Sequence, residues 1–303
     1  MASTSTIEAA VAVTPVTHAK PVDTADAAPT AEMLRAHEDR LRRRESMLRI
    51  AVPAGIVLAL LLLWEWMVRA NNIPHYILPA PSLILRTLFD NWDSLSSALW
   101  FTVKLTLLAL TAAIVGGVLL AIAFALFKWV EIGLFPIAVI LQVTPIIAIA
   151  PLILIYVSST TAALLLCAWI VAFFPILSNT VIGLKSADSN LRDLFQLYKA
   201  SPWQTFRYLL APSALPYFMA GLKIAGGLSL IGAVVAEFTA GTAGKETGLA
   251  SRILESSFRT EIPMMFAALL LVSLLGIVIF IVFAALSRMV LGHWHESEMR
   301  RER

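Results

Sequence analysis

The chain alternates between long apolar runs and short polar segments. A helix rises about 1.5 Å per residue, so about twenty apolar residues cross the ~30 Å hydrocarbon core of a bilayer. Six such runs predict six transmembrane helices, and the sequence therefore predicts an all-α, polytopic membrane protein. The approximate bounds of the runs are residues 50–68, 100–127, 131–156, 161–184, 216–238 and 264–288.

The segments outside these runs give the rest of the organisation. Residues 1–31 are rich in Ala, Thr, Val and Pro without periodicity, which is typical of a disordered tail. They lack the basic start and apolar core of a secretory signal peptide. Residues 32–49 are strongly charged and favour a cytoplasmic helix before the first span. A transmembrane domain over residues 50–290 and a polar tail over residues 291–303 complete the chain.

The segment between the first two runs, residues 70–99, is too polar to cross a membrane. An amphipathic stretch from Ser82 to Trp92 predicts a short helix there. Ser82 follows a proline and precedes the apolar positions, so we expect it to cap this helix.

Composition and charge agree with a membrane protein. Of the 303 residues, 59% are hydrophobic and 14% charged, whereas a soluble domain is about half apolar and a quarter charged. Cytoplasmic loops carry an excess of Lys and Arg. If the N-terminus is cytoplasmic, 17 of the 23 Lys and Arg lie on the inner side. We therefore expect both termini in the cytoplasm, and no nucleic-acid partner, because topology explains the basic residues.

Several polar residues and a proline in the apolar runs are candidates for a translocation pathway or its gate. A charge at the centre of a span costs about 2.5–3.5 kcal/mol, so polar groups there usually face protein or water. The candidates are Gln142, Thr144, Pro145, Asn179, Ser229 and Glu237.

The first three candidates coincide with an expected helix kink at Pro145. Transporters build binding sites from broken helices, because a break frees backbone groups. For Gln142, Thr144 and Asn179 the alternative is hydrogen bonding between helices. For Glu237, near the outer end of its span, the alternatives are a gate residue, a salt bridge across the outer mouth and an acid that reaches the membrane interface.

A polar loop, residues 186–215, predicts two short helices. The first is the amphipathic segment LRDLFQLY (191–198), and the second is WQTFRYLL (203–210), with Pro202 at a favourable first-turn position. The break between them consists of Lys199, Ala200, Ser201 and Pro202.

We expect Pro212 and Pro216 to end the second helix and to hinge it to the next span. The bent pair of helices would present Phe195, Trp203 and Phe206 as anchors. Aromatic anchors of this kind concentrate the binding energy of protein interfaces.

The 186–215 loop resembles the EAA loop of binding-protein-dependent ABC permeases of the nitrate, sulfonate, taurine and bicarbonate type. That pattern is Glu-Ala-Ala, three residues, Gly, nine residues and Ile-x-Leu-Pro. Asp193 stands for the acid, Leu209 for the aliphatic residue and Pro212 for the proline. The residues that depart from the pattern are Leu194, Phe195, Lys199 and Ala211. Lysine in place of glycine puts the usual turn geometry in question.

Flanking segments are similar to the same family in the same order, so the resemblance covers about residues 50–290. They are LPAPS (78–82), QVTPIIAIAPL (142–152), FFPILSNTVIGLK (173–185) and ALPYFMAGLKIAGGLSLIGAVVAEF (214–238).

The resemblance implies the type I ABC-importer permease fold, located in the bacterial inner membrane. The implied function is passage of a small solute, either nitrate-, sulfonate- or taurine-like or a small aromatic or heterocyclic compound. The implied partners are an ABC ATPase dimer, a second permease subunit that is expected to be an identical copy, and an extracytoplasmic solute-binding protein. The residues implied in ATPase coupling are Asp193, Phe195, Lys199, Ala200, Ser201, Trp203, Phe206, Leu209 and Pro212.

No enzymatic site is expected in this chain. Gly244-Lys245 lacks the upstream glycine of a phosphate-binding loop, where Thr239 stands instead. ATP and Mg²⁺ are therefore expected in the partner ATPase, with no cofactor and no metal bound here. The alternative function is a secondary transporter or channel without an ATPase. It would need buried acids or bases in several spans, and spans two to four have almost none.

Overall fold

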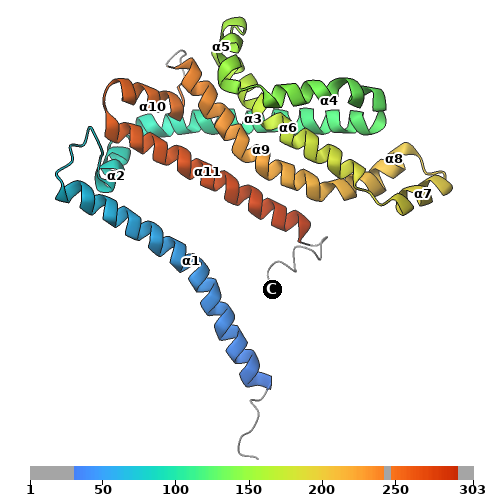
Figure 1. The fold of residues 1–303 in the computed structure, drawn as a ribbon, viewed down its shortest axis with the longest axis horizontal. Helices are drawn as coiled ribbons and strands as arrows, with labels where there is room; N and C mark the ends of the chain where they lie inside the picture. The colour runs from blue at the N-terminus through green and yellow to red at the C-terminus, as the bar shows by residue number, and fades with distance from the viewer. Residues whose placement is uncertain (1–30, 242–246, 293–303) are drawn as a thin grey trace, which may run out of the picture. The chain divides into compact units, whose positions relative to one another are not determined.

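The computed structural model describes residues 31–241 and 247–292, and every regular element in these residues is a helix. Almost all of both predicted tails, and the Gly244-Lys245 pair, lie outside the described residues. Figure 1 labels the helices along the chain. In order they are α1 (Ala31–Ala70), α2 (Pro81–Asp90), α3 (Trp92–Leu126), α4 (Lys128–Val143), α5 (Ile146–Tyr156), α6 (Thr160–Lys185), α7 (Ser189–Leu197), α8 (Pro202–Thr205), the π turn η1 (Phe206–Leu210), α9 (Ala211–Ala240), α10 (Leu249–Phe258) and α11 (Ile262–Leu291).

Within residues 31–241 and 247–292, five helical segments are long and apolar enough to cross a membrane, and a bent pair passes the same test together. The pair is α4 and α5, whose axes differ by 103°. Five or six spans agree with the six predicted, so the all-α polytopic fold is confirmed. The five single segments are Ala51–Ala70, Trp92–Leu126, Thr160–Lys185, Pro202–Ala240 and Ile262–Leu291.

The third predicted span, residues 131–156, is broken rather than straight. Thr144 has an extended backbone, with φ −69° and ψ 122°, and Pro145 follows with φ −62° and ψ 117°. Proline has no backbone N–H and disfavours the helical conformation of the residue before it. The kink predicted at this point is therefore confirmed, and it amounts to a full break between α4 and α5.

The first of two compact units ends at Leu61, and its described part, residues 31–61, belongs to the single continuous helix α1. The predicted charged helix over residues 32–49 therefore continues into the first span without interruption. Val52, Ile56 and Leu60 in this stretch are more than half exposed. A helix with apolar side chains exposed around it is typical of a segment that contacts lipid.

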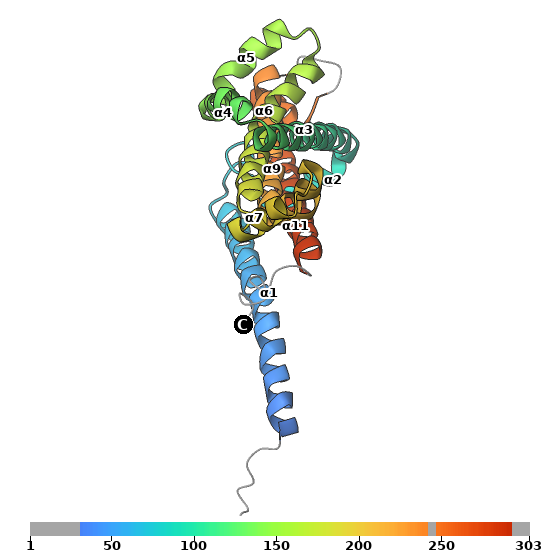
Figure 2. The same cartoon turned by 90° about the vertical axis from the view of Figure 1, so that its right-hand side faces the viewer.

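The second unit, from Leu62 onward, is centred on α6, which packs against α9 and α3 (Figure 1, Figure 2). A Cβ atom on Gly183 would lie 2.8 Å from the Cα atom of Ala214, and one on Gly232 would lie 2.9 Å from that of Ala168. Small residues let membrane helices approach this closely. The backbones of α6 and α9 are thus in near contact at two widely separated points.

The short helix α2 begins one residue earlier than predicted, and Ser82 does not cap it. The residue before the helix is Ala80, and Pro81 occupies the first turn. Instead, Glu65 of α1 accepts hydrogen bonds from the Ser82 backbone N–H at 3.0 Å and from the Ser82 hydroxyl at 2.8 Å. The expected cap was wrong because a carboxylate from another helix takes its place at the free N–H groups.

A second glutamate performs the same role at the start of α10. Glu237 of α9 is fully buried, and its side chain accepts hydrogen bonds from the Ala250 N–H and the Thr102 hydroxyl, both at 2.9 Å. The Thr102 hydroxyl in turn accepts from the Leu249 N–H at 2.9 Å. These contacts join α3, α9 and α10 and satisfy N–H groups at the start of α10 that have no partner within the helix.

Gly248 leaves room for the Glu237 carboxylate, so we expect Gly248→Ala to destabilise the fold. An added Cβ would overlap the carboxylate, although the extended backbone at this residue, with φ −90° and ψ −173°, suits any side chain. Loss of the buried hydrogen bonds costs about 2–3 kcal/mol, which lowers the melting temperature of the detergent-solubilised protein by about 4–12 °C. The matched control is Gly133→Ala in α4, where nothing lies within 4 Å of an added Cβ. An equal effect of both changes would contradict the proposed role of Gly248.

Candidate functional site

The break between α4 and α5 borders a cavity of about 280 Å³. Gln142, Thr144 and Pro145, which the sequence places at a kink, all line it, together with residues of α6 and α9. Gln142 is exposed, whereas the Thr144 hydroxyl donates a hydrogen bond to the Ile140 carbonyl at 2.7 Å. The remaining lining residues are Leu141, Val143, Ile146, Ile170, Val171, Pro175 and Leu228. All ten are uncharged.

The other three pathway candidates are not among the residues that line this cavity. The Asn179 amide donates to the Pro175 carbonyl of its own helix at 2.8 Å, and the Ser229 hydroxyl donates to the Gly226 carbonyl at 2.9 Å. Glu237 is buried at the start of α10, where its carboxylate accepts hydrogen bonds from the Ala250 N–H and the Thr102 hydroxyl. A pathway role for these three residues stays a prediction.

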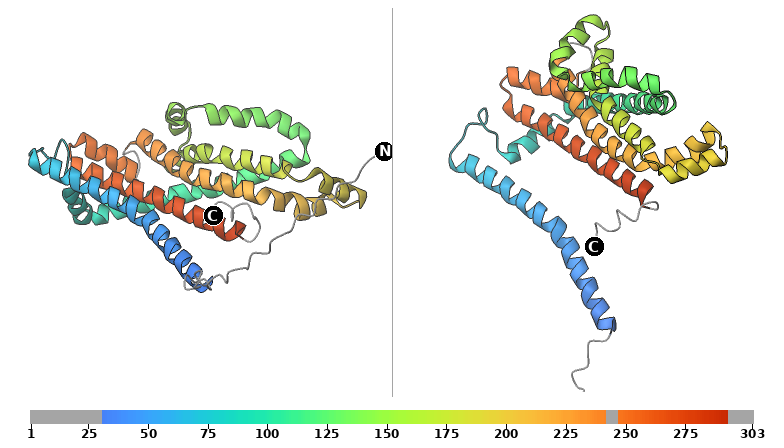
Figure 3. Two further views of the ribbon diagram at one scale, coloured as in Figure 1. Left: turned by 60° about the horizontal axis from the view of Figure 1, so that its bottom comes forward. Right: turned by 45° about the vertical axis from the view of Figure 1, so that its right-hand side comes forward.

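The first predicted helix of the 186–215 loop is present as α7. Asp188 precedes it, and its side chain accepts a hydrogen bond from the Asn190 N–H at 2.7 Å, as an N-terminal cap does. Asp193, which stands for the acid of the EAA pattern, lies in the middle of α7 and is exposed. Figure 3 shows α7 and α8 projecting beyond the ends of α6 and α9.

The turn after α7 keeps a glycine-like geometry although Lys199 occupies it. Lys199 has φ +51°, in the left-handed region that glycine tolerates best. Its N–H donates to the Gln196 carbonyl, and the Ala200 N–H donates to the Phe195 carbonyl, both at 2.9 Å. This pair of bonds is the Schellman motif that closes many helices. The turn is therefore formed by the lysine at a cost in backbone strain.

The second predicted helix begins as expected. The Ser201 hydroxyl accepts from the Gln204 N–H at 3.2 Å, and the Gln204 side chain accepts from the Ser201 N–H at 2.7 Å. This reciprocal capping box, with Pro202 in the first turn, starts α8.

Contrary to prediction, neither Pro212 nor Pro216 ends that helix. The π turn Phe206–Leu210 leads directly into α9, and the Ala211 N–H donates to the Phe206 carbonyl five residues back. The wider turn changes the hydrogen-bond register just before Pro212, which falls in the first turn of α9, where a missing N–H is tolerated. The loop and the span thus form one continuous helical segment without a proline hinge.

The predicted anchors differ in how accessible they are. Trp203 is 65% exposed and stacks on Phe206 with ring centroids 5.8 Å apart. Phe206 and Phe195 are half-buried, and Leu209 is buried. Sequence reasoning missed Leu197 and Tyr198, each 80% exposed at the end of α7, and Tyr208 at 66%. The apolar and aromatic residues of LRDLFQLY and WQTFRYLL indicated these positions, but only phenylalanine and tryptophan side chains were predicted to be anchors.

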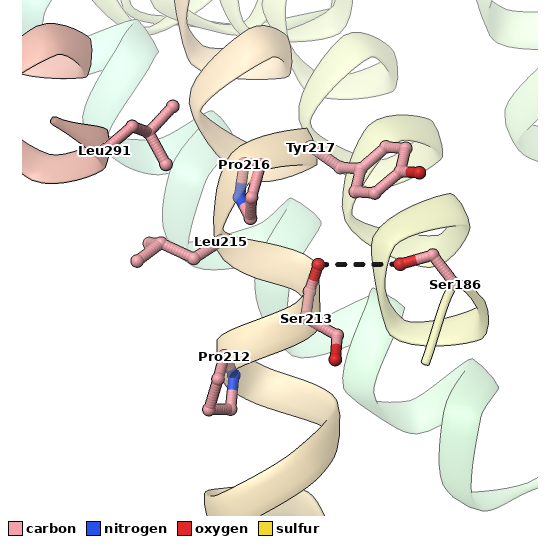
Figure 4. Close-up of a pocket in the computed structure, with 7 residues that line it drawn as sticks. All are labelled: Ser186, Pro212, Ser213, Leu215, Pro216, Tyr217 and Leu291. Atoms are coloured by element: carbon pink, nitrogen blue, oxygen red, sulfur yellow. Dashed lines mark hydrogen bonds between the residues drawn. The ribbon is translucent and has the colours of Figure 1, made fainter. Parts of the chain in front are cut away.

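A second cavity, of about 400 Å³, lies where the loop joins the transmembrane helices. Figure 4 shows the Ser186 hydroxyl, at the end of α6, directed toward the Ser213 carbonyl of α9 at a distance of 3.5 Å. The residues that line the cavity are Ser186, Pro212, Ser213, Leu215, Pro216, Tyr217 and Leu291. Across the described part of the chain, no three His, Cys, Asp or Glu residues gather in a group suited to a metal ion.

Several known proteins are similar in sequence to this chain over most of its length. The riboflavin transport system permease protein of Chloroflexus aurantiacus is 32% identical, over 84% of this chain and 96% of that protein. The formylaminopyrimidine transport permease protein of Halalkalibacterium halodurans is 33% identical, over 81% of this chain and 96% of that protein. A nitrate import permease protein of Synechocystis is 28% identical, over 65% of this chain and 74% of that protein.

The model of one protein family matches residues 113–292, which include α4 to α11 and the whole 186–215 loop. The match covers more than half of the chain and agrees with the permeases named above and with the five or six candidate spans. The chain belongs to the family of binding-protein-dependent transport system inner membrane components, the permeases of ABC transporters.

Proposed function

We propose that this chain is the permease subunit of an ATP-driven importer and forms the translocation pathway for a small solute. The observation that carries the proposal is the 186–215 loop, which projects from α6 and α9 with Leu197, Tyr198 and Trp203 exposed. Large apolar and aromatic side chains gathered on one surface are typical of a protein interface. The proposed partner at this surface is an ABC ATPase, which binds the ATP and Mg²⁺.

The proposed mechanism is alternating access. The loop connects α6 to α9, and these helices contribute Val171, Pro175 and Leu228 to the cavity at the break. Movement of the loop when the ATPase dimer closes would shift both helices and change which side of the membrane the cavity faces. The residues of the loop would then transmit force and perform no chemistry.

The remaining partners and the orientation belong to the same proposal. The basic residues favour N- and C-termini in the cytoplasm, which places the loop on the side where ATP is available. A second permease subunit, proposed to be an identical copy, would complete the pathway in the bacterial inner membrane. An extracytoplasmic binding protein would deliver the solute at the opposite face.

For the solute we propose a small heterocyclic compound rather than an anion such as nitrate. Two relatives that match more than four fifths of this chain are named for riboflavin and formylaminopyrimidine. The cavity at the break is lined by uncharged side chains, with the Gln142 amide as a polar group. An unpaired anion in such surroundings is costly, whereas a heterocycle needs apolar contact and a few hydrogen bonds.

We expect Trp203→Glu to remove the ATPase from the complex, because a charge would be placed in the apolar contact. The expected result is at least a tenfold loss of co-purified ATPase per permease after mild solubilisation, measured by quantitative mass spectrometry. Phe258→Glu is the matched control, because Phe258 is 81% exposed but lies outside the loop, at the end of α10. Phe195 and Phe206 are less suitable, since their half-buried rings also hold the loop together.

If the unaltered chain purifies without any ATPase, under conditions that preserve other ABC complexes, the importer proposal is wrong. A secondary transporter would then be the better interpretation. If Trp203→Glu retains its ATPase fully, the ATPase docks elsewhere.

We expect Lys199→Gly to keep the ATPase and Lys199→Val to lose most of it. Glycine relieves the left-handed backbone by about 1 kcal/mol, whereas a β-branched side chain raises the strain and opens the turn. The measurement is the same ratio of ATPase to permease. Lys199→Asn separates charge from geometry, since asparagine tolerates this backbone without a positive charge. Loss of the ATPase in the glycine and asparagine variants alike would show that the lysine charge matters, and the turn does not.

The proposed solute class can be tested by measuring uptake in cells that carry the complete transport system. We expect labelled riboflavin or formylaminopyrimidine to enter faster than in cells lacking this chain, and excess nitrate or taurine to leave that uptake unchanged. Uptake of nitrate that depends on this chain, without uptake of either heterocycle, would overturn the proposed solute class while leaving the importer proposal intact.

A further inference from the structure

An ion pair joins the first half of the broken span to the helix from which the 186–215 loop emerges. The Lys185 ammonium contacts the Glu131 carboxylate. Glu131 lies in the first turn of α4, and Lys185 is the last residue of α6, immediately before the loop. The two residues are 54 positions apart in the sequence, so the pair is a tertiary contact between two helices.

Four residues on one face of α4 extend from this ion pair to the cavity. Glu131, Phe135, Ala138 and Gln142 follow one another at spacings of four, three and four residues, which places them on the same side of a helix. Phe135 contacts Phe174 of α6, with ring centroids 6.3 Å apart, and Ala138 is buried. Gln142 lines the cavity. Eleven residues of helix extend about 17 Å, so α4 links the root of the loop to the break.

The Glu131–Lys185 ion pair contributes little to the stability of the fold. The Lys185 side chain is 55% exposed and that of Glu131 is 24% exposed. Ion pairs with this much contact with solvent contribute little to folding stability. Phe135 additionally packs against Phe124 of α3, with ring centroids 6.3 Å apart, so α4 keeps apolar contacts without the pair.

We propose that Glu131 and Lys185 are positioning residues that transmit movement of the 186–215 loop to α4 and so to the cavity at the break. This inference rests on the proposed ATP-driven function. When the loop moves, the end of α6 moves with it, and the ion pair carries the start of α4 along. Because α4 is one continuous helix that ends at the break before Pro145, a shift of its start also moves Gln142 in the wall of the cavity.

The test uses membrane vesicles that contain the complete transporter with its ATPase. The reporter is Gln142→Cys in a Cys167→Ala background, since Cys167 is the one native cysteine. A membrane-permeant maleimide labels the reporter in the presence and absence of ATP with vanadate, and the ratio of the two rates is measured. We expect the ratio to differ clearly from one with the native pair. Lys185→Glu or Glu131→Lys should reduce that nucleotide effect at least fivefold.

The double exchange Glu131→Lys with Lys185→Glu re-creates the pair with reversed charges and should restore at least half of the effect. A residue needed only for folding would not be rescued in this way. The matched control is Arg86→Glu, which breaks the exposed Arg86–Asp90 ion pair of α2 and should leave the effect unchanged. ATPase content is measured in every sample.

A full nucleotide effect in both single variants would overturn the inference, as would failure of the double exchange with the ATPase still bound. Absence of any nucleotide effect with the native pair, although the ATPase is present, would overturn the inference as well. Absence of the ATPase from the native complex would instead mean that the proposed function fails, and the inference with it. The two failures are therefore distinguishable.

Discussion

Helices α6 and α9 approach each other so closely that three glycines along their contact have no room for a side chain. A Cβ on Gly221 would lie 2.8 Å from the Pro175 carbonyl oxygen, and those on Gly183 and Gly232 would be equally close to α9 and α6 backbone atoms. Lipid gives no hydrophobic driving force between helices, so such packing must supply the attraction. The rest of the second unit is arranged around this pair, because α3 packs on α6 and α11 on α9. The same two helices carry both ends of the 186–215 loop.

Helix ends are the second constraint, because a bilayer offers no water to their free N–H groups. The chain meets it twice with a glutamate from a neighbouring helix, Glu65 at the start of α2 and Glu237 at the start of α10. A carboxylate at a helix N-terminus also complements the helix dipole. Each glutamate thereby fixes a short amphipathic helix against a transmembrane one, which explains how an acid is accommodated inside an apolar helix such as α9.

The sequence was sufficient for features that depend on local composition. The apolar runs predicted the spans, Pro145 predicted the break, and Pro202 predicted the start of α8. The sequence was insufficient where a side chain forms its hydrogen bonds with residues that are distant in the chain. Nothing near Ser82 indicates that Glu65 displaces it as a cap, and nothing near Glu237 indicates that Thr102 and the start of α10 enclose it. The Glu131–Lys185 pair was missed for the same reason. Lys199 shows the converse case, because backbone hydrogen bonds impose a left-handed turn that the residue type disfavours.

The π turn at Phe206–Leu210 sets the rotational phase between the loop and the membrane. A helix advances about 100° per residue, so the extra residue of a π turn rotates everything before it relative to everything after it by about that angle. The direction of the exposed Trp203 ring relative to the buried face of α9 is therefore set by the one extra residue of the π turn. Loss or gain of a single residue in this turn would therefore re-aim the whole projecting surface relative to the transmembrane helix that follows it.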